Sequence, residues 1–79
     1  MNNDRRKRIS KAWLLIDQAE EILSQVLGEE EESYDNLLEG LQNGARGEQM
    51  QEYIETLGEV DDKIQEIKDD LDGILNRGT

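Results

Sequence analysis

The chain has 79 residues, of which 20 are acidic and nine are basic, and its formal net charge is −11. It contains no Cys, His, Pro or Phe. A disulfide scaffold, a Cys- or His-based zinc site, a Cys nucleophile and a His general base are therefore excluded, and no cofactor is expected. The longest apolar run, residues 12–16, is far too short to span a membrane. No signal peptide is visible, so we expect one small, soluble, cytoplasmic domain.

The charge is unevenly distributed along the chain. Residues 1–11 hold five bases and one acid, a net charge of +4, whereas residues 12–79 hold four bases and 19 acids, a net charge of −15. An acidic body repels phosphate, so free nucleic acid is not expected as a ligand. A basic protein surface is the natural partner. The same composition is compatible with disorder, but the periodicity of the apolar residues argues against it.

The first predicted element is a helix over about residues 4–35, with Asn2, Asn3 or Asp4 as its N-terminal cap. Its apolar residues recur at alternating spacings of three and four, which is a heptad pattern. The predicted seam consists of Ile9, Ala12, Ile16, Ala19, Leu23 and Val26. The apolar stripe is wider than a two-stranded coiled coil needs, because the seam is flanked by Trp13, Leu15, Ile22 and Leu27.

We expect this helix to continue through Gly28 to about Asp35. The alternative is that Gly28 ends it as a C-terminal cap and that a short separate helix follows. A turn over about residues 36–45 comes next, because Asn43-Gly44 and Gly47 are turn signals. The tip is expected to be closed by a small apolar cluster of Tyr34, Leu37, Leu38 and Leu41.

The second predicted helix covers about residues 46–76, and Gly78 is its expected terminator. Its heptad seam runs unbroken through Met50, Tyr53, Leu57, Val60, Ile64, Ile67, Leu71 and Ile74. Gly58 and Gly73 interrupt it at a cost of about 1 kcal/mol each relative to Ala. Acidic residues fill most of its other positions.

Two long helices joined by a short turn predict an all-α fold, an antiparallel helical hairpin of coiled-coil type. Residues whose numbers add up to about 81–84 are expected to lie side by side, so that Val26 faces the region of Leu57 and Ile16 faces Ile67. Two helices alone bury little apolar surface, and the apolar residues that lie off the seam are Leu15, Ile22, Leu27, Ile54 and Leu75.

We therefore expect a homodimer that forms a four-helix bundle, or docking of the hairpin onto a host protein. The residues expected in the core or in the dimer interface are Trp13, Ile16, Leu23, Leu57, Ile64 and Leu71. If Trp13 were exposed instead, it would be a candidate binding anchor.

The central stretch carries a resemblance. An acidic run at residues 29–32 leads to Tyr34 and to Asp35-Asn36-Leu37, then to Leu41-Gln42 and to residues 46–50, which read Arg-Gly-Glu-Gln-Met. This pattern resembles a group of small acidic proteins of phages and bacterial mobile elements, from which the chain departs at Leu38 (Pro in the pattern) and Gly40 (Ser in the pattern). The resemblance implies a setting in mobile DNA and no mechanism. By analogy, small acidic proteins in that setting often inhibit host defence systems, including CRISPR nucleases.

An acidic row is predicted on the second helix, formed by Glu48, Glu52, Glu55, Glu59, Asp62 and Glu66. Such a row can imitate the phosphates of nucleic acid and occupy a basic groove. The alternative is a solvated coiled-coil surface. An ordinary solvated face mixes charges of both signs, however, and no base lies between Arg46 and Lys63.

The isolated bases have two interpretations each. Arg46 either neutralises residues 29–32 and the end of the first helix or, with Tyr34, forms a contact point at the tip. The basic residues 5–8 either pair with the acids of residues 69–72, remain solvated at the helix end, or bind nucleic acid.

Paired carboxylates provide an enzymatic alternative. Glu29 with Glu32, and Glu59 with Asp62, resemble the magnesium ligands of all-α nucleotide pyrophosphohydrolases. With 20 acids in 79 residues, however, such spacings also arise by chance. The hydrolase interpretation predicts magnesium-dependent turnover of nucleoside triphosphates that is lost in Glu59→Gln.

The sequence therefore favours a non-enzymatic acidic protein that binds and inhibits a basic, nucleic-acid-handling protein in the cytoplasm of a bacterial host. Direct binding to nucleic acid or to a membrane is not expected. The first alternative is a self-assembling structural or accessory protein without a host target. In that case the acidic row matters little, and Ile64→Asp abolishes assembly.

Overall fold

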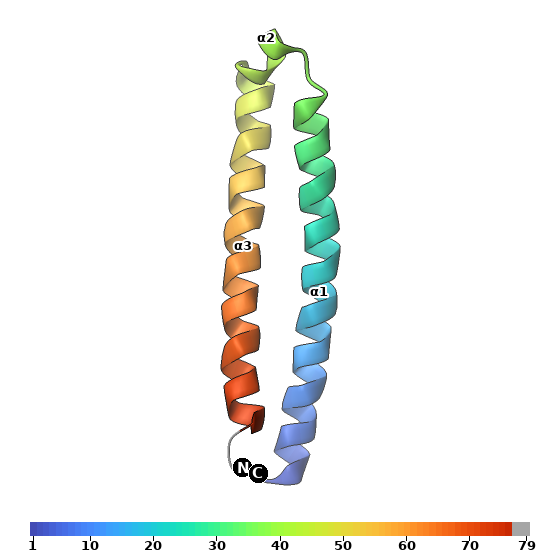
Figure 1. Cartoon of the computed structure of the whole chain (residues 1–79), viewed down its shortest axis with the longest axis vertical. Helices are drawn as coiled ribbons and strands as arrows, with labels where there is room; N and C mark the ends of the chain where they lie inside the picture. The colour runs from blue at the N-terminus through green and yellow to red at the C-terminus, as the bar shows by residue number, and fades with distance from the viewer. Residues whose placement is uncertain (77–79) are drawn as a thin grey trace.

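The computed structural model describes residues 1–76 as a long helical hairpin. The helices are α1 (Asn3–Asp35), α2 (Glu39–Gln42) and α3 (Ala45–Asn76). The long helices α1 and α3 run antiparallel beside each other, and the short α2 lies at the tip (Figure 1). The rod measures 58 × 15 × 14 Å. The predicted all-α antiparallel hairpin is confirmed, and residues 1–76 contain no strand.

Helix α1 is capped as expected and passes through Gly28 without a break. The Arg5 backbone N–H donates to Asn2 Oδ1 at 2.9 Å, so Asn2 is the N-cap and satisfies one of the amides that a helix start leaves unpaired. The predicted end near Asp35 is confirmed, and the alternative of a stop at Gly28 is wrong. The strong helix formers around Gly28 outweigh the cost of one glycine.

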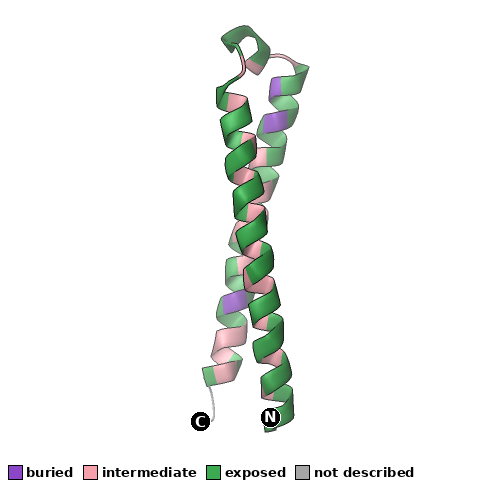
Figure 2. Cartoon of the chain, turned by 90° about the vertical axis from the view of Figure 1, so that its right-hand side faces the viewer, coloured by how far each residue is buried: buried purple, intermediate pink, exposed green. Residues whose placement is uncertain are grey.

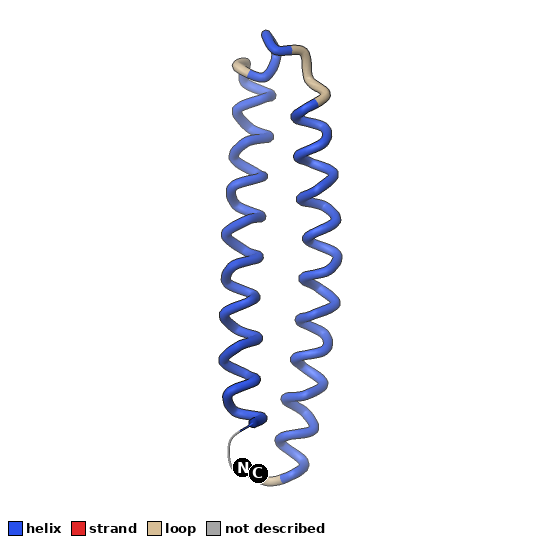
Figure 3. Tube along the Cα trace, in the orientation of Figure 1, coloured by secondary structure: helices blue, strands red, loops and turns tan. Residues whose placement is uncertain are grey.

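The tip is more ordered than the sequence indicates. The predicted turn over residues 36–45 contains the one-turn helix α2, flanked by two short loops (Figure 3). The Leu41 N–H donates to the Leu38 carbonyl at 2.8 Å, and the Gly44 N–H donates to the Leu41 carbonyl at 3.1 Å. The expected apolar cluster is only half formed. Tyr34 and Leu37 are half-buried, but Leu38 is 75% exposed and Leu41 54% exposed.

Gly47 lets the chain return closely on itself after α2. A Cβ atom at this position would run into the backbone of Gln42, including its carbonyl oxygen. Gly47 is buried, as is Met50 one helical turn later. Glycine is thus required here for a close approach of two backbone segments and not for an unusual backbone angle.

Helix α3 begins at Ala45 and ends at Asn76, which confirms the prediction of about 46–76. The expected terminator, Gly78, lies outside the described residues. Side chains that connect α1 and α3 join residues whose numbers add up to between 81 and 88. Some of these sums fall within the predicted range of 81–84, and the others lie up to four above it.

The seam between α1 and α3 follows a heptad pattern on both helices, and its residues are half-buried or buried (Figure 2). On α1 it consists of Arg6, Ile9, Trp13, Ile16, Glu20, Leu23, Leu27, Glu30 and Tyr34, and Leu37 continues it in the loop after the helix. On α3 it consists of Gly47, Met50, Ile54, Leu57, Asp61, Ile64, Lys68, Leu71 and Leu75. We call these positions a and d. All six residues predicted for the core or dimer interface belong to this seam.

Half of the predicted seam positions are wrong. Ile9, Ile16 and Leu23 lie in the seam as predicted, and so do four apolar residues of α3. At the alternate positions, the seam residue lies one position later in the chain than predicted. Leu27 is in the seam instead of Val26, and Lys68 instead of Ile67. Ile16 therefore lies opposite Lys68 and not Ile67. The sequence contains two apolar stripes that share every second residue, and the hairpin uses the stripe that contains Lys68, whose ammonium group pairs with Asp17 and Glu20 of α1.

The stripe that the seam leaves out lies on one side of the hairpin. In an antiparallel pair of helices, the g positions of both flank one side of the seam and the e positions flank the other. On α1 this apolar face comprises Ala12, Ala19 and Val26 at g, together with Leu15 and Ile22 at the adjacent c positions. On α3 it comprises Tyr53, Val60, Ile67 and Ile74. All of these except the half-buried Val60 are exposed. Leu15 and Ile22 therefore remain uncovered, as predicted, whereas Leu27, Ile54 and Leu75 do not.

The opposite side, which we call the polar face, is lined by the e positions. They are Ser10, Asp17, Ser24 and Glu31 on α1, and Gln51, Gly58, Gln65 and Asp72 on α3. Open grooves place Glu31 beside Gln51 near the tip, and Ser10 beside Asp72 near the other end. The residues that flank the seam are thus mainly apolar on one side and polar on the other.

The isolated hairpin has almost no hydrophobic core. Met50, at 8% exposure, is the one buried hydrophobic residue among residues 1–76, and none of their side chains is completely buried. No helix in this part of the chain combines the length and the apolar character that crossing a bilayer requires.

Replacing Gly47 by Ala is expected to lower the free energy of unfolding by about 1–3 kcal/mol, because the added methyl group collides with the Gln42 backbone. Gly28→Ala is the matched control, since a Cβ at Gly28 has nothing within 4 Å. It should raise the free energy of unfolding by about 0.5–1 kcal/mol, because Ala is the better helix former. Chemical denaturation followed by circular dichroism measures both. Equal effects of the two variants would contradict the assigned role of Gly47.

Candidate partner-binding surface

The acidic row on α3 faces solvent along its whole length. All six of its residues, Glu48, Glu52, Glu55, Glu59, Asp62 and Glu66, are exposed. They occupy the b and f positions of the heptad, on the outer side of α3 away from the apolar face. The row is about 27 Å long at 1.5 Å per residue. None of the six carboxylates forms an ion pair with another of the described residues, so their charge is available to a partner.

The negative charge is concentrated toward the tip. Residues 29–55 hold nine acids and one base, a net charge of −8, and together they form the tip half of the hairpin. The opposite end carries the basic residues 1–11. A hairpin with charge separated in this way has a strong negative field at the tip end.

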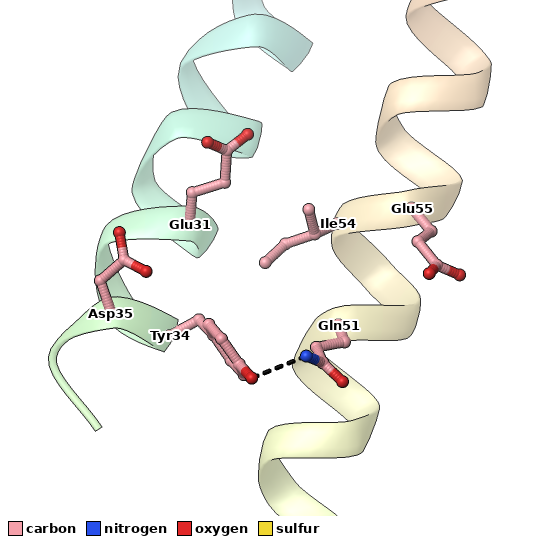
Figure 4. A pocket seen from close by; sticks show the side chains of 6 residues that line it. All are labelled: Glu31, Tyr34, Asp35, Gln51, Ile54 and Glu55. Carbon is pink, nitrogen blue, oxygen red and sulfur yellow. Dashed lines mark hydrogen bonds between the residues drawn. The ribbon is translucent and has the colours of Figure 1, made fainter. Parts of the chain in front are cut away.

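An open groove of about 410 Å³ lies on the polar face beside the tip (Figure 4). It is lined by Glu31, Tyr34, Asp35, Gln51, Ile54 and Glu55. Tyr34 and Gln51 point toward each other across the groove, and Gln51 Nε2 donates to the Tyr34 hydroxyl at 2.6 Å. The groove combines three carboxylates with one aliphatic side chain, a lining that suits the charged head and apolar stem of a Lys or Arg side chain. Glu55 belongs to both this groove and the acidic row.

Tyr34 and Arg46 do not form the shared contact surface at the tip that the sequence offered as one interpretation. Tyr34 is half-buried, and its carbonyl accepts a hydrogen bond from Gln42 Nε2 at 3.0 Å in addition to the bond at its hydroxyl. Arg46 is exposed at the start of α3, and its guanidinium forms no ion pair within residues 1–76. The interpretation that Arg46 neutralises residues 29–32 is therefore not supported by a direct ion pair. Tyr34 stabilises the tip.

The strongest electrostatic site of the hairpin lies inside the seam and was missed by the sequence analysis. Lys68 is only 7% exposed. Its Nζ atom lies 2.6 Å from Asp17 Oδ1 and 2.9 Å from Glu20 Oε1, and it sits 4.8 Å from the centre of the Trp13 ring. The Trp13 indole N–H donates to the Lys68 carbonyl at 3.3 Å. One feature of the sequence could have indicated this site. Ile54, Lys68 and Leu75 fall at the same heptad position, and a charged residue among apolar ones at that position suggests a buried ion pair.

The Lys68 contacts determine its protonation. Hydrogen bonds from the ammonium group to Asp17 and Glu20 raise the pKa of Lys68 above its ordinary value of 10.5, and they outweigh the opposing effect of burial. The ammonium group is therefore charged at neutral pH and neutralises part of the negative charge in the seam. Trp13 contributes through the cation–π contact.

Asp61 is the destabilising member of this polar region. Burial, followed by the charge and hydrogen bond of the nearby Glu20, raises the pKa of Asp61 above 3.8, and Lys68 only partly opposes this shift. Asp61 occupies a seam position where an apolar residue would pack without an electrostatic cost.

Two arginines at the basic start of α1 contact other groups of the hairpin. Arg8 forms an ion pair with Asp4 at 3.0 Å on its own helix. The Arg6 guanidinium crosses to α3 and donates to the Leu75 carbonyl at 3.0 Å. The expected carboxylate partners, Asp69, Asp70 and Asp72, lie near this end of α3.

The paired carboxylates of the hydrolase alternative all face solvent. Glu29 and Glu32 on α1 and Glu59 and Asp62 on α3 are exposed. Within residues 1–76, no three acidic side chains are grouped so that they could hold a metal ion.

Comparison with family models, with curated proteins and with solved structures gives no match to this chain.

Replacing Lys68 by Met is expected to lower the thermal unfolding midpoint at pH 7, because Asp17 and Glu20 lose their shared counterion. Lys63→Met removes the same charge at an exposed position and should have little effect. Adding Glu20→Gln to Lys68→Met should recover part of the loss. If the Lys63 and Lys68 variants unfold at the same temperature, the buried ion pairs do not stabilise the hairpin.

Asp61→Asn is expected to raise the thermal unfolding midpoint at pH 7. A carboxyl whose pKa is raised in the folded state stabilises that state when it is protonated. This contribution is complete at pH values below the unfolded-state pKa of 3.8, and it is lost as the pH rises through the pKa of the folded state. The benefit of Asn should therefore disappear when the pH falls below 3.8. Glu59→Gln, an exposed neutralisation, controls for net charge. A gain for Asp61→Asn that is independent of pH would contradict this explanation.

Proposed function

We propose that this chain is a non-enzymatic acidic protein of a phage or mobile element. It binds a basic, nucleic-acid-handling protein in the cytoplasm of a bacterial host and blocks that protein, as an anti-defence inhibitor of the anti-CRISPR type does. The observation that supports this proposal is the exposed acidic row of α3, which runs for six carboxylates without an ion pair. The resemblance of the central stretch to small phage proteins supports the setting.

The row resembles a nucleic-acid strand in the regularity of its charge. Successive carboxylates are separated by three or four residues, about 5.4 Å along the helix axis. A basic groove that holds phosphates at a similar spacing can exchange them for these carboxylates and release the counterions of both surfaces. Binding of this kind is fast and falls with rising salt concentration. The groove beside the tip adds a place for one basic side chain next to Glu55, the third residue of the row.

We also propose that the chain forms a homodimer with four helices in its core. The supporting observation is that Met50 alone among the hydrophobic residues of positions 1–76 is buried in the single hairpin. Two-helix structures of this size seldom bury enough apolar area to remain folded as monomers. Sedimentation equilibrium should give about twice the mass of one chain, and a stable monomer at about 100 μM would contradict this proposal.

Neutralising Glu52, Glu55, Glu59 and Glu66 to Gln is expected to weaken target binding about 30-fold, since four exposed ion pairs of about 0.5 kcal/mol each are lost. Tagged protein is used to capture partners from a bacterial lysate at about 50 and about 300 mM salt, and the captured proteins are identified by mass spectrometry. A basic nuclease or helicase should appear at low salt, decrease at high salt and be displaced by added DNA.

The matched control neutralises four exposed acids outside both the acidic row and the tip, namely Asp4, Glu21, Asp69 and Asp70. It changes the net charge equally and should retain the partner and inhibit its activity. Equal loss of binding in both variants would show that only net charge matters. Capture of the bait alone at both salt concentrations would favour the structural alternative, in which the chain has no host target.

A further inference from the structure

The apolar face is the largest feature of the hairpin that the acidic row and the tip groove do not use. Six of the ten large hydrophobic residues that are exposed in the described chain lie on it: Leu15, Ile22, Val26, Tyr53, Ile67 and Ile74. Ala12 and Ala19 of α1 lie nearly level with Ile74 and Ile67 of α3, so small and large side chains alternate across the face. Exposed apolar surface of this continuity marks an interaction site.

The solvent-exposed area of the chain is larger than that of a compact monomer of the same mass. The chain exposes 6126 Å². A compact monomer of this mass exposes about 4,900 Å². The excess is comparable to the roughly 800 Å² that each partner contributes to a stable protein interface. One second copy on the apolar face would therefore bring the exposed area of each chain close to that of an ordinary globular protein.

The heptad pattern of both long helices is that of a four-helix bundle. Each helix has apolar residues at a and d toward the other helix and at g toward the apolar face. This three-position pattern is typical of bundle helices, whereas a two-stranded coiled coil needs only a and d. The hairpin thus supplies half of such a bundle, and an identical hairpin supplies a matching half.

The charge distribution selects the orientation of the second copy. A parallel arrangement would place two tips, each with a net charge of −8, beside each other. An antiparallel arrangement separates the tips and places each beside the basic start of the partner, where residues 1–11 carry a net charge of +4. Arg5 and Arg8 flank the apolar face at that end, and Glu29 flanks it at the other. Opposite charges therefore meet at both ends of an antiparallel pair.

We infer that two copies of this chain pack antiparallel through the apolar face, with the two-fold axis near Ala19 and perpendicular to the hairpin. The inference rests on the self-association proposed above and adds the face and the orientation. Ala19 lies at the middle of the face on α1, and its small side chain permits close approach. The acidic row occupies other positions of α3, so both rows remain exposed in the dimer and run in opposite directions.

The face is tested with one variant on it and one matched variant off it. Ile22, at 61% exposure, lies on the apolar face, and Leu14, at 56% exposure, lies on the polar side. Ile22→Glu should raise the dimer dissociation constant about 100-fold, because each dimer would bury two unpaired carboxylates. Leu14→Glu should change it less than about threefold. Circular dichroism confirms that both variants remain helical, and sedimentation equilibrium gives the dissociation constants.

The orientation is tested with spin labels, because the chain has no native Cys. Single Cys residues replace the exposed Asn43 at the tip and the exposed Gln18 near the proposed axis. In an antiparallel dimer the labels at position 43 should be separated by nearly the 58 Å length of the hairpin, and those at position 18 by less than half of it. Short distances at both positions would establish a parallel dimer and overturn the inference.

The remaining outcomes separate the two proposals. A wild-type monomer overturns self-association itself and the inference with it. A dimer that Leu14→Glu disrupts as strongly as Ile22→Glu leaves self-association intact and overturns the choice of face. Neither result bears on binding of the acidic row to a host protein, which the four-residue neutralisation tests independently.

Discussion

The buried ammonium group of Lys68 is the constraint on which the alignment of the two long helices depends. Its contacts with Asp17 and Glu20 neutralise a charge that the seam could not otherwise hold. A slip of one heptad in either direction would replace these two acids by Ser10 and Trp13 or by Ser24 and Leu27. Neither alternative offers a carboxylate, so the register that forms the ion pairs is strongly preferred. A polar residue in an apolar seam thus gives specificity at a cost in stability.

This constraint also decides which surfaces remain for function. Because the charged stripe is buried in the seam, the more apolar stripe is left on the surface, and the hairpin acquires one apolar and one polar face. The acidic row of α3 lies outside both the seam and the apolar face, so the proposed self-association and the proposed partner binding would use different residues. The proposed dimer would therefore still present an uninterrupted negative surface.

The electrostatics of the hairpin combine local neutralisation with an overall imbalance. Lys68 offsets Glu20 in the seam and Asp17 beside it, whereas the nearby Glu20 opposes the ionisation of Asp61. Toward the tip, nine acids accompany a single base. Such accumulation costs stability through self-repulsion, and it is the physical basis of the proposed attraction for a basic partner. Stability and proposed function therefore place opposite demands on the same carboxylates.

The sequence by itself determined the two long helices, their ends, the antiparallel hairpin and the passage of α1 through Gly28, because these depend on local propensity and on the period of the apolar residues. It also located the acidic row, since exposure of b and f positions follows from the same period. Only the tertiary structure decided that Leu27 and Lys68 enter the seam in place of Val26 and Ile67. Two apolar stripes shared the same heptad, and the choice between them depended on ion pairs between residues about 50 positions apart, which no local pattern contains.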